Sequence, residues 1–192
     1  IIIMIILFPV GAVAYYFIVK NRVGNKVSAE KMGSAGGTAP TPLRREVETE
    51  ETLQLKELIG KFNKAYHYEK LGQVYISQKK MDLAIPQFEE AIQRDPEMLE
   101  ARYGLAKCYH GLEKYEEAIS VLESLTAIDK KYDYGNAIFG LAECYRLSGN
   151  EEKALETYGE VINSFHFFKA YYHYARLLDN KGKKQEAIDY MK

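Results

Sequence analysis

The sequence lacks tryptophan and has only two cysteines and four histidines among 192 residues. Two cysteines are too few for a disulfide-stapled scaffold or a cysteine-rich metal protein. The histidines have no partner at a metal-ligand spacing such as His-x-x-x-His, and no Gly-x-Ser-x-Gly sequence occurs. The glycine-rich stretch at residues 33–37 has no Gly-Lys-Ser/Thr ending with which to hold a phosphate. We therefore expect no catalytic residues, no metal, no cofactor and no small-molecule substrate.

An excess of charge of one sign is also absent. The 26 Lys and Arg residues are balanced by 27 Asp and Glu residues, which removes the usual electrostatic reason to expect binding to nucleic acid. The charges are unevenly distributed, however. Six basic and two acidic residues lie up to Glu46, and 20 basic and 25 acidic residues follow from Val47 onward. The 47% hydrophobic fraction is typical of a globular protein, so we expect the acidic body to fold.

The longest uncharged run stands at the start of the chain. Residues 1–19 read IIIMIILFPVGAVAYYFIV. At about 1.5 Å per residue, such a helix spans roughly 28 Å, which is enough for the core of a lipid bilayer. We predict a single transmembrane helix here. A buried core helix and a cleaved signal peptide are the alternatives, but the apolar run continues past the Ala-Val-Ala sequence that resembles a cleavage site.

Aromatic and basic residues flank the end of this segment. Four side chains are expected to lie at the level of the lipid headgroups: Tyr15, Tyr16, Lys20 and Arg22. Because basic residues favour the cytoplasmic side of a membrane, we predict a cytoplasmic body. A basic segment before Ile1 would instead place the body on the periplasmic or external side. Residues 20–46 contain GSAGGTAPTP and are predicted to form a basic flexible linker.

Small residues repeat at a regular interval in the remainder of the chain. One series consists of Gly72, Ala106, Ala142 and Ala175, at spacings of 34, 36 and 33 residues. A second series has the same spacings and lies 12 residues further on: Ala84, Ala118, Ala154 and Ala187. Two helices of fixed relative register therefore recur about every 34 residues.

This pattern resembles the tetratricopeptide repeat. The first unit carries nearly the whole motif: Tyr68, Leu71, Gly72, Tyr75, Ala84, Phe88, Ala91 and Pro96. The resemblance divides the chain into repeats at residues 65–98, 99–134, 135–167 and 168–192, of which the last is incomplete. It implies an all-α fold, a solenoid of helical hairpins that follows the transmembrane helix.

The spacing also indicates how the hairpins pack. We expect Gly72 and Ala84 to form the close contact between the two helices of the first hairpin. A two-residue insertion around residues 131–134 displaces the third unit. Cys108 and Cys144 occupy matching positions of successive repeats, where we expect buried thiols in preference to a disulfide.

One further helix is predicted at residues 47–64, before the first repeat. Thr49 is a candidate N-cap, and Leu55, Ile59 and Phe62 lie on one apolar stripe. Because the terminal repeat of a solenoid needs a cover, we expect this helix to cap the stack. The alternatives are a contact with a partner protein and a coiled coil, for which the stripe is short.

The resemblance implies a binding wall on the concave side, formed by the first helix of each repeat. Carried over to this register, the wall consists of Tyr66, Glu69, Gln73, Ile76, Tyr103, Lys107, His110, Asn136, Phe139, Glu143, Arg146, Tyr172, Arg176 and Asp179. The family's clamp for chaperone C-termini is not matched, because Glu69 and Gln73 stand where Lys and Asn would be needed. We expect about half of the aromatic side chains at residues 165–174 to pack in the core and the others to form a further contact surface.

These observations predict a membrane-anchored scaffold or adaptor that binds other proteins. We expect a subunit or assembly factor of a membrane-associated complex. The alternatives are a quality-control or assembly adaptor that recruits enzymes to the membrane, and the anchor and repeat region of an enzyme with a catalytic domain beyond residue 192.

Overall fold

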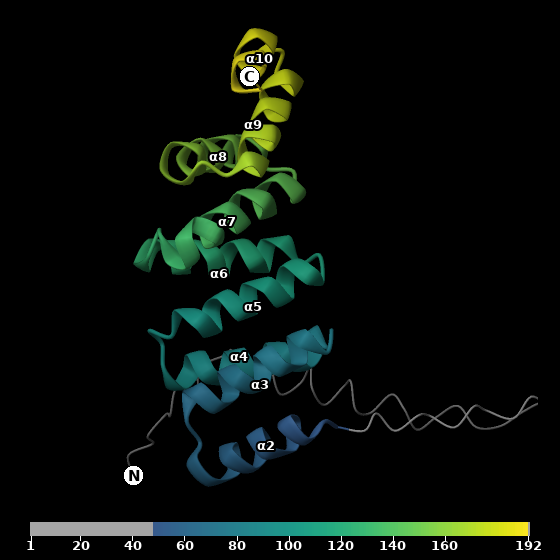
Figure 1. The fold of residues 1–192 in the computed structure, drawn as a ribbon, viewed down its shortest axis with the longest axis vertical. Coiled ribbons are helices and arrows are strands. Elements are labelled where there is room, and N and C mark those ends of the chain that lie inside the picture. The colour runs from purple at the N-terminus through teal and green to yellow at the C-terminus, as the bar shows by residue number, and fades with distance from the viewer. Residues whose placement is uncertain (1–47, 192) are drawn as a thin grey trace, which may run out of the picture. The chain divides into compact units, whose positions relative to one another are not determined.

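The computed structural model describes residues 48–191. In that part of the chain every regular element is a helix, and the helices follow one another in a single stack (Figure 1). The elements are α2 (Glu50–Phe62), α3 (Ala65–Ser77), α4 (Met81–Arg94), α5 (Leu99–Gly111), α6 (Tyr115–Ile128), the 3₁₀ helix η1 (Tyr132–Gly135), α7 (Asn136–Leu147), α8 (Glu151–Phe165), α9 (Phe168–Asn180) and α10 (Lys184–Tyr190). Each α-helix packs against the next along the chain, and α3 also contacts α5. This is the helical-hairpin solenoid that the spacing predicted.

The predicted membrane segment at residues 1–19, its headgroup anchors and the linker at residues 20–46 lie outside the described residues. Among residues 48–191, no helix combines the length and the hydropathy that crossing a bilayer requires.

A left-handed residue ends the first helix of every hairpin. Lys79, Glu113, Gly149 and Gly182 have φ angles between 59° and 83° and recur at the repeat spacing. In each turn the following N–H donates to a carbonyl five residues back, as from Lys80 to Tyr75 at 2.9 Å and from Asn150 to Tyr145 at 2.8 Å. This bond pattern satisfies carbonyls that the helix leaves unpaired at its end. The turns therefore set a similar hairpin geometry in each repeat, whether or not the position is a glycine.

Helix α2 packs against the first helix of the first hairpin. The Thr49 side chain accepts from the Thr52 N–H, as expected for an N-cap. Leu55 and Ile59 contact the core of the first hairpin. Thr52 is buried, and its hydroxyl accepts from the Gln78 side chain at 3.3 Å, which ties α2 to the α3–α4 turn. Phe62 at the other end of α2 is 56% exposed, so the apolar stripe is only partly used.

The core of the first hairpin centres on Phe88, which has no exposed surface. A Cβ atom added at Gly72 would lie 2.7 Å from this ring, and one added at Gly104 would also collide with it. Both residues of the predicted close contact, Gly72 and Ala84, are buried, and the Phe88 ring packs directly over Gly72. Two glycines on neighbouring helices thus make room for one large ring.

The cysteines of the second and third repeats are both free, buried thiols, as predicted. Burial raises the pKa of Cys108 and of Cys144 to about 11, so neither thiol ionises at neutral pH.

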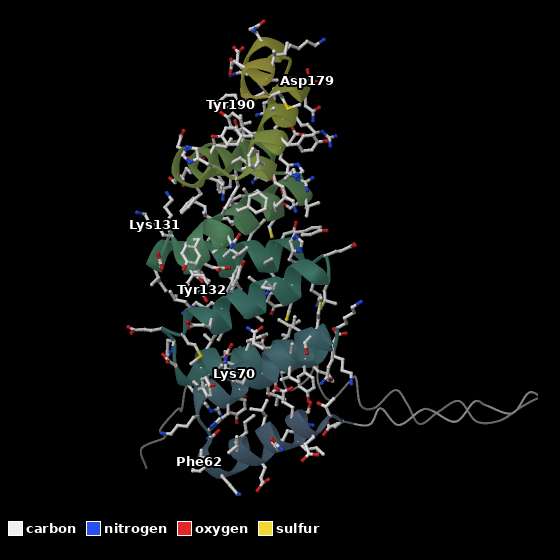
Figure 2. The ribbon with its side chains drawn as sticks, viewed as in Figure 1. Phe62, Lys70, Lys131, Tyr132, Asp179 and Tyr190 are labelled. Atoms are coloured by element: carbon white, nitrogen blue, oxygen red, sulfur yellow. The ribbon has the colours of Figure 1, made fainter. Side chains whose placement is uncertain are left out.

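The insertion before the third hairpin forms η1. Asp133, Tyr134 and Gly135 are left-handed in succession, with φ of 51°, 55° and 89°. The Tyr134 side chain is 87% exposed, whereas Tyr132 packs against the core. In Figure 2, Lys131 and Tyr132 lie on the same edge of the stack as Phe62, where each hairpin passes to the next.

Candidate interaction groove

A groove of about 470 Å³ lies between α5 and α7. We call it the α5–α7 groove, and it is lined by Met81, Tyr103, Ala106, Lys107, His110, Gly111, Leu122, Asn136, Phe139, Gly140, Glu143 and Cys144. Six of the residues that the family resemblance assigned to a binding wall are among them: Tyr103, Lys107, His110, Asn136, Phe139 and Glu143. The structure therefore brings together the middle of the proposed wall.

Small residues give the groove its depth. Ala106 and Gly140 occupy adjacent first helices, and neither fills the space between them. A Cβ atom added at Gly140 would have only Leu122 Cδ1 near it, at 3.8 Å. A methyl group at this point would therefore make only an ordinary van der Waals contact.

Aromatic residues form the two walls and are held by further rings. Tyr103 meets Tyr132 edge-on, with ring centroids 5.5 Å apart. Phe139 meets Phe167 at 5.6 Å and Tyr158 at 6.1 Å, also edge-on. Such pairs favour one relative orientation of the rings, so the walls are already arranged before anything binds. Phe139 also contributes to the core, which a sequence register alone did not show.

A polar network closes the α9 side of the groove. Glu143 accepts hydrogen bonds from Arg146 at 2.9 Å and from the buried Tyr158 hydroxyl. His173 Nε2 lies 3.5 Å from Glu143 Oε1 and its ring stacks on Tyr158. Burial opposes the ionisation of Glu143, but the hydrogen bonds from Arg146 and Tyr158 outweigh it and hold its pKa below the usual value. Glu143 is thus a charged group whose charge is already compensated.

The positive charges of α7 and α9 also act on His173. Burial lowers the pKa of His173, and the nearby charges of Arg146 and Arg176 lower it further, although Glu143 opposes them. His173 is therefore neutral at neutral pH.

Carboxylates lie near the Tyr103–Tyr132 pair at the α5 wall, whereas Lys107 and His110 of the same helix line the groove itself. Burial raises the pKa of Tyr132 to about 12, and the nearby carboxylates of Glu100 and Asp133 add to this effect, with Glu69 a smaller contributor. Burial also raises the pKa of Tyr103, again with a contribution from Asp133. Carboxylates therefore gather around the Tyr103–Tyr132 pair.

The remaining predicted wall residues lie outside the groove. Glu69 is only 4% exposed, with Lys70 as an ion-pair partner at 3.4 Å, while Tyr66 is 57% exposed. Gln73 lines a separate depression of about 400 Å³ between α2 and α3. Arg146 takes part in the Glu143 network, and Tyr172 and Arg176 are exposed on α9. The wall is thus a central groove with two flanks, and Glu69 offers a partner almost no surface.

Several residues that shape the groove escaped the sequence analysis. Tyr132 belongs to the insertion, which the repeat register does not cover, and Leu122 reaches the groove from the second helix of its hairpin. Only Gly140, a glycine in the middle of a predicted helix, could have been noticed as unusual. Among residues 48–191, no group of three His, Cys, Asp or Glu side chains is placed to hold a metal ion.

The stacked hairpins, each packed on the next, define a helical-repeat protein of the α-solenoid class. The family model of the tetratricopeptide repeat matches residues 75–135, 113–177 and 168–192. The chain belongs to the tetratricopeptide repeat family.

Solved structures with the same fold include two proteins of the MamA type and YrrB. A crystal structure of MamA protein is 25% identical with a TM-score of 0.67, covering 73% of this chain and 76% of that one. MamA from Desulfovibrio magneticus RS-1 is 18% identical with a TM-score of 0.67, covering 73% of this chain and 79% of that one. YrrB, described as a TPR protein with an unusual peptide-binding site, is 19% identical with a TM-score of 0.63, covering 71% of this chain and 70% of that one. A search of curated proteins finds no match to the sequence.

Proposed function

We propose that this protein is an interaction scaffold whose α5–α7 groove holds a segment of a partner protein. The observation that carries this proposal is the groove itself, with two aromatic walls and a floor left open at Gly140. Aromatic residues in a partly enclosed site are common energetic centres of protein interfaces. The description of YrrB as a peptide-binding protein supports the same use of a similar fold.

We extend the proposal to the location of the scaffold. The uncharged run at residues 1–19 is long enough to anchor the chain in a membrane, and the basic residues after it favour a cytoplasmic body. The partner would then belong to a membrane-associated complex, of which this chain is a subunit or an assembly factor.

Filling the groove tests the proposed function. Gly140→Leu should place a side chain in the groove and lower the affinity for the partner about thirtyfold, the loss typical of a blocked hot spot of about 2 kcal/mol. Folding should not suffer, because leucine favours a helix by about 1 kcal/mol over glycine. The partner is first identified by affinity purification of the full chain with mass spectrometry, and its affinity for each variant is then measured with purified proteins.

Gly60→Leu is the matched control. Gly60 lies in α2, is exposed, and an added Cβ atom there has no neighbour within 4 Å. This variant should bind the partner as the unchanged protein does. If Gly140→Leu keeps the full affinity and the wild-type melting temperature, the partner does not use the groove.

A separate experiment tests the membrane topology by labelling an introduced thiol, because both native thiols are buried. Cys108 and Cys144 have no exposed surface, so an introduced Ser34→Cys should be the reactive thiol of the chain. A membrane-impermeant maleimide should leave it unlabelled in intact cells and label it after lysis. Labelling without lysis would place the body on the periplasmic or external side.

A further inference from the structure

Two links between successive hairpins expose large apolar side chains. Phe168, the first residue of α9, is 92% exposed, and Tyr134 in η1 is 87% exposed. Ile128, which ends α6 shortly before η1, is 59% exposed. We call these three residues the link edge. None of them belongs to the hydrophobic core of residues 48–191, so the link edge leaves its apolar surface open to solvent.

The two links pack against each other. A Cβ atom added at Gly135, next to Tyr134, would lie 2.6 Å from the Phe165 ring, and η1 contacts α8. Phe165 in turn stacks on Phe167, with ring centroids 6.0 Å apart, and Phe168 follows directly in the chain. Tyr134 and Phe168 therefore flank one packed joint and do not belong to distant parts of the stack.

The backbone of Tyr134 indicates that its exposure has a use. Its φ angle is 55°, in the left-handed region that is unfavourable for a bulky residue. The side chain buries almost no surface in return. Residues held in such conformations are concentrated at functional sites. The link edge is therefore a candidate contact surface.

The side chains around the link edge are of the kinds found where a membrane meets water. Aromatic rings and lysine side chains lie preferentially at the level of the lipid headgroups. Lys131 and Lys169 stand close to the two rings in sequence, both are exposed, and neither has an ion-pair partner within residues 48–191. The carboxylates of Asp129 and Asp133 each accept a hydrogen bond within their own turn, at 2.9 and 3.3 Å. The two lysines are thus available to lipid phosphates.

The proposed anchor holds the body within reach of the bilayer. Residues 20–47 join the uncharged run to α2, and a flexible chain of this length averages about 30 Å from end to end. The start of α2 lies at the opposite edge of the stack, where Thr52 accepts from Gln78 of the α3–α4 turn. Helix α2 has 13 residues, so it crosses the stack in about 20 Å. The linker is therefore long enough for the link edge to turn toward the membrane.

We propose that the link edge is a second contact with the bilayer, in which Tyr134 and Phe168 insert their rings at the headgroup level and the two lysines meet lipid phosphates. This inference rests on the membrane anchor of the proposed function. A linker alone leaves the body free to rotate, whereas two points of contact fix one orientation of the stack. The α5–α7 groove would then face a defined direction relative to the membrane.

Tryptophan fluorescence tests this contact, because the sequence contains no tryptophan. Tyr134→Trp and Phe168→Trp each replace one exposed ring by another and should keep the fold, which circular dichroism checks. The full chain is reconstituted into vesicles of phosphatidylcholine and phosphatidylglycerol, with and without bromine on the acyl chains. Bromine quenches tryptophan only at short range. Both variants should lose most of their emission in the brominated vesicles.

Leu147→Trp is the matched control. Leu147 ends α7 at the opposite edge of the stack, beside the α7–α8 turn, and is 37% exposed. Its tryptophan should stay bright in brominated vesicles. Link-edge probes that remain as bright as this control, on chains that float with the vesicles, would overturn the inference.

Separate readouts distinguish the failure of this inference from the failure of the proposed function. Flotation reports the anchor, so a chain that floats with bright link-edge probes loses only the second contact. A chain that does not float overturns both the anchor and the second contact. Partner affinity reports on proteins: if Tyr134→Ser combined with Phe168→Ser abolishes partner binding while the probes stay bright, a protein covers the link edge in place of lipid, and the inference is overturned.

Discussion

Replacing Phe88 by alanine should lower the free energy of unfolding by about 3–5 kcal/mol, the usual cost of deleting a fully buried aromatic ring. The ring has no exposed surface and fills the space between α3 and α5 that Gly72 and Gly104 leave open. Neighbouring helices cannot collapse into this space without shifting two hairpins against each other. Urea denaturation followed by circular dichroism measures the change. Phe62→Ala, at a residue 56% exposed, should cost less than about 1 kcal/mol.

A double-mutant cycle with Gly104→Ala isolates the contact. Alone, Gly104→Ala should destabilise the protein by about 1–3 kcal/mol, because the added methyl group collides with the Phe88 ring. In the Phe88→Ala background the collision is gone, and the same substitution should be neutral or stabilising, since alanine favours a helix over glycine. Equal effects in the two backgrounds would mean that Gly104 and Phe88 do not meet.

The repeat register was predictable from the sequence because each repeat faces the same packing problem. The seven alanines of the two small-residue series are all buried, as are Leu71, Tyr75 and Ala91 of the first motif. A residue that must lie between two helices has to be small or apolar in every copy, so the requirement appears as a spacing. Lys79 and Glu113 occupy left-handed turn positions, but neither residue is glycine, so the sequence did not indicate this backbone conformation.

The partners of individual side chains were not predictable in the same way. Phe88 meets Gly72 and Gly104 from two different helices, and Glu143 meets Tyr158 and His173 from two more. In each case one partner, Gly104 or His173, belongs to the next hairpin, so the geometry depends on how each hairpin is rotated on the last. The wall register placed Phe139 on the concave side, but it could not indicate that the ring also supports the core.

The sequence also did not indicate that Glu69 and Thr52 are buried. Both are polar residues for which the sequence favours an exposed position, yet Glu69 is 4% and Thr52 is 1% exposed. Each is paired, Glu69 with Lys70 and Thr52 with Gln78.

The aromatic run at residues 165–174 divides between core and surface, with Phe165 and Tyr174 packed against the core and Phe168 92% exposed.

Gly135→Ala should cost about 2–3 kcal/mol, for two reasons that can be separated. The residue has a φ of 89°, which costs a side-chain-bearing residue about 1–2 kcal/mol. A Cβ atom there would also lie 2.6 Å from the Phe165 ring, so the turn or the ring must move. Gly149→Ala provides the matched control, because Gly149 has a φ of 83° and no atom within 4 Å of an added Cβ. It should show the backbone cost alone.

The difference between the two variants measures the contact between Gly135 and Phe165, and it has a consequence for binding. Gly135 ends η1, which holds Tyr132 against the groove wall at Tyr103, and Phe165 stacks on Phe167, which supports Phe139. Movement at Gly135 should therefore disturb both aromatic walls. We expect Gly135→Ala to weaken the binding of the partner segment under conditions in which the protein remains folded, and Gly149→Ala to leave it unchanged. Equal losses of stability in urea denaturation, with unchanged affinity in both variants, would show that the insertion does not position the groove.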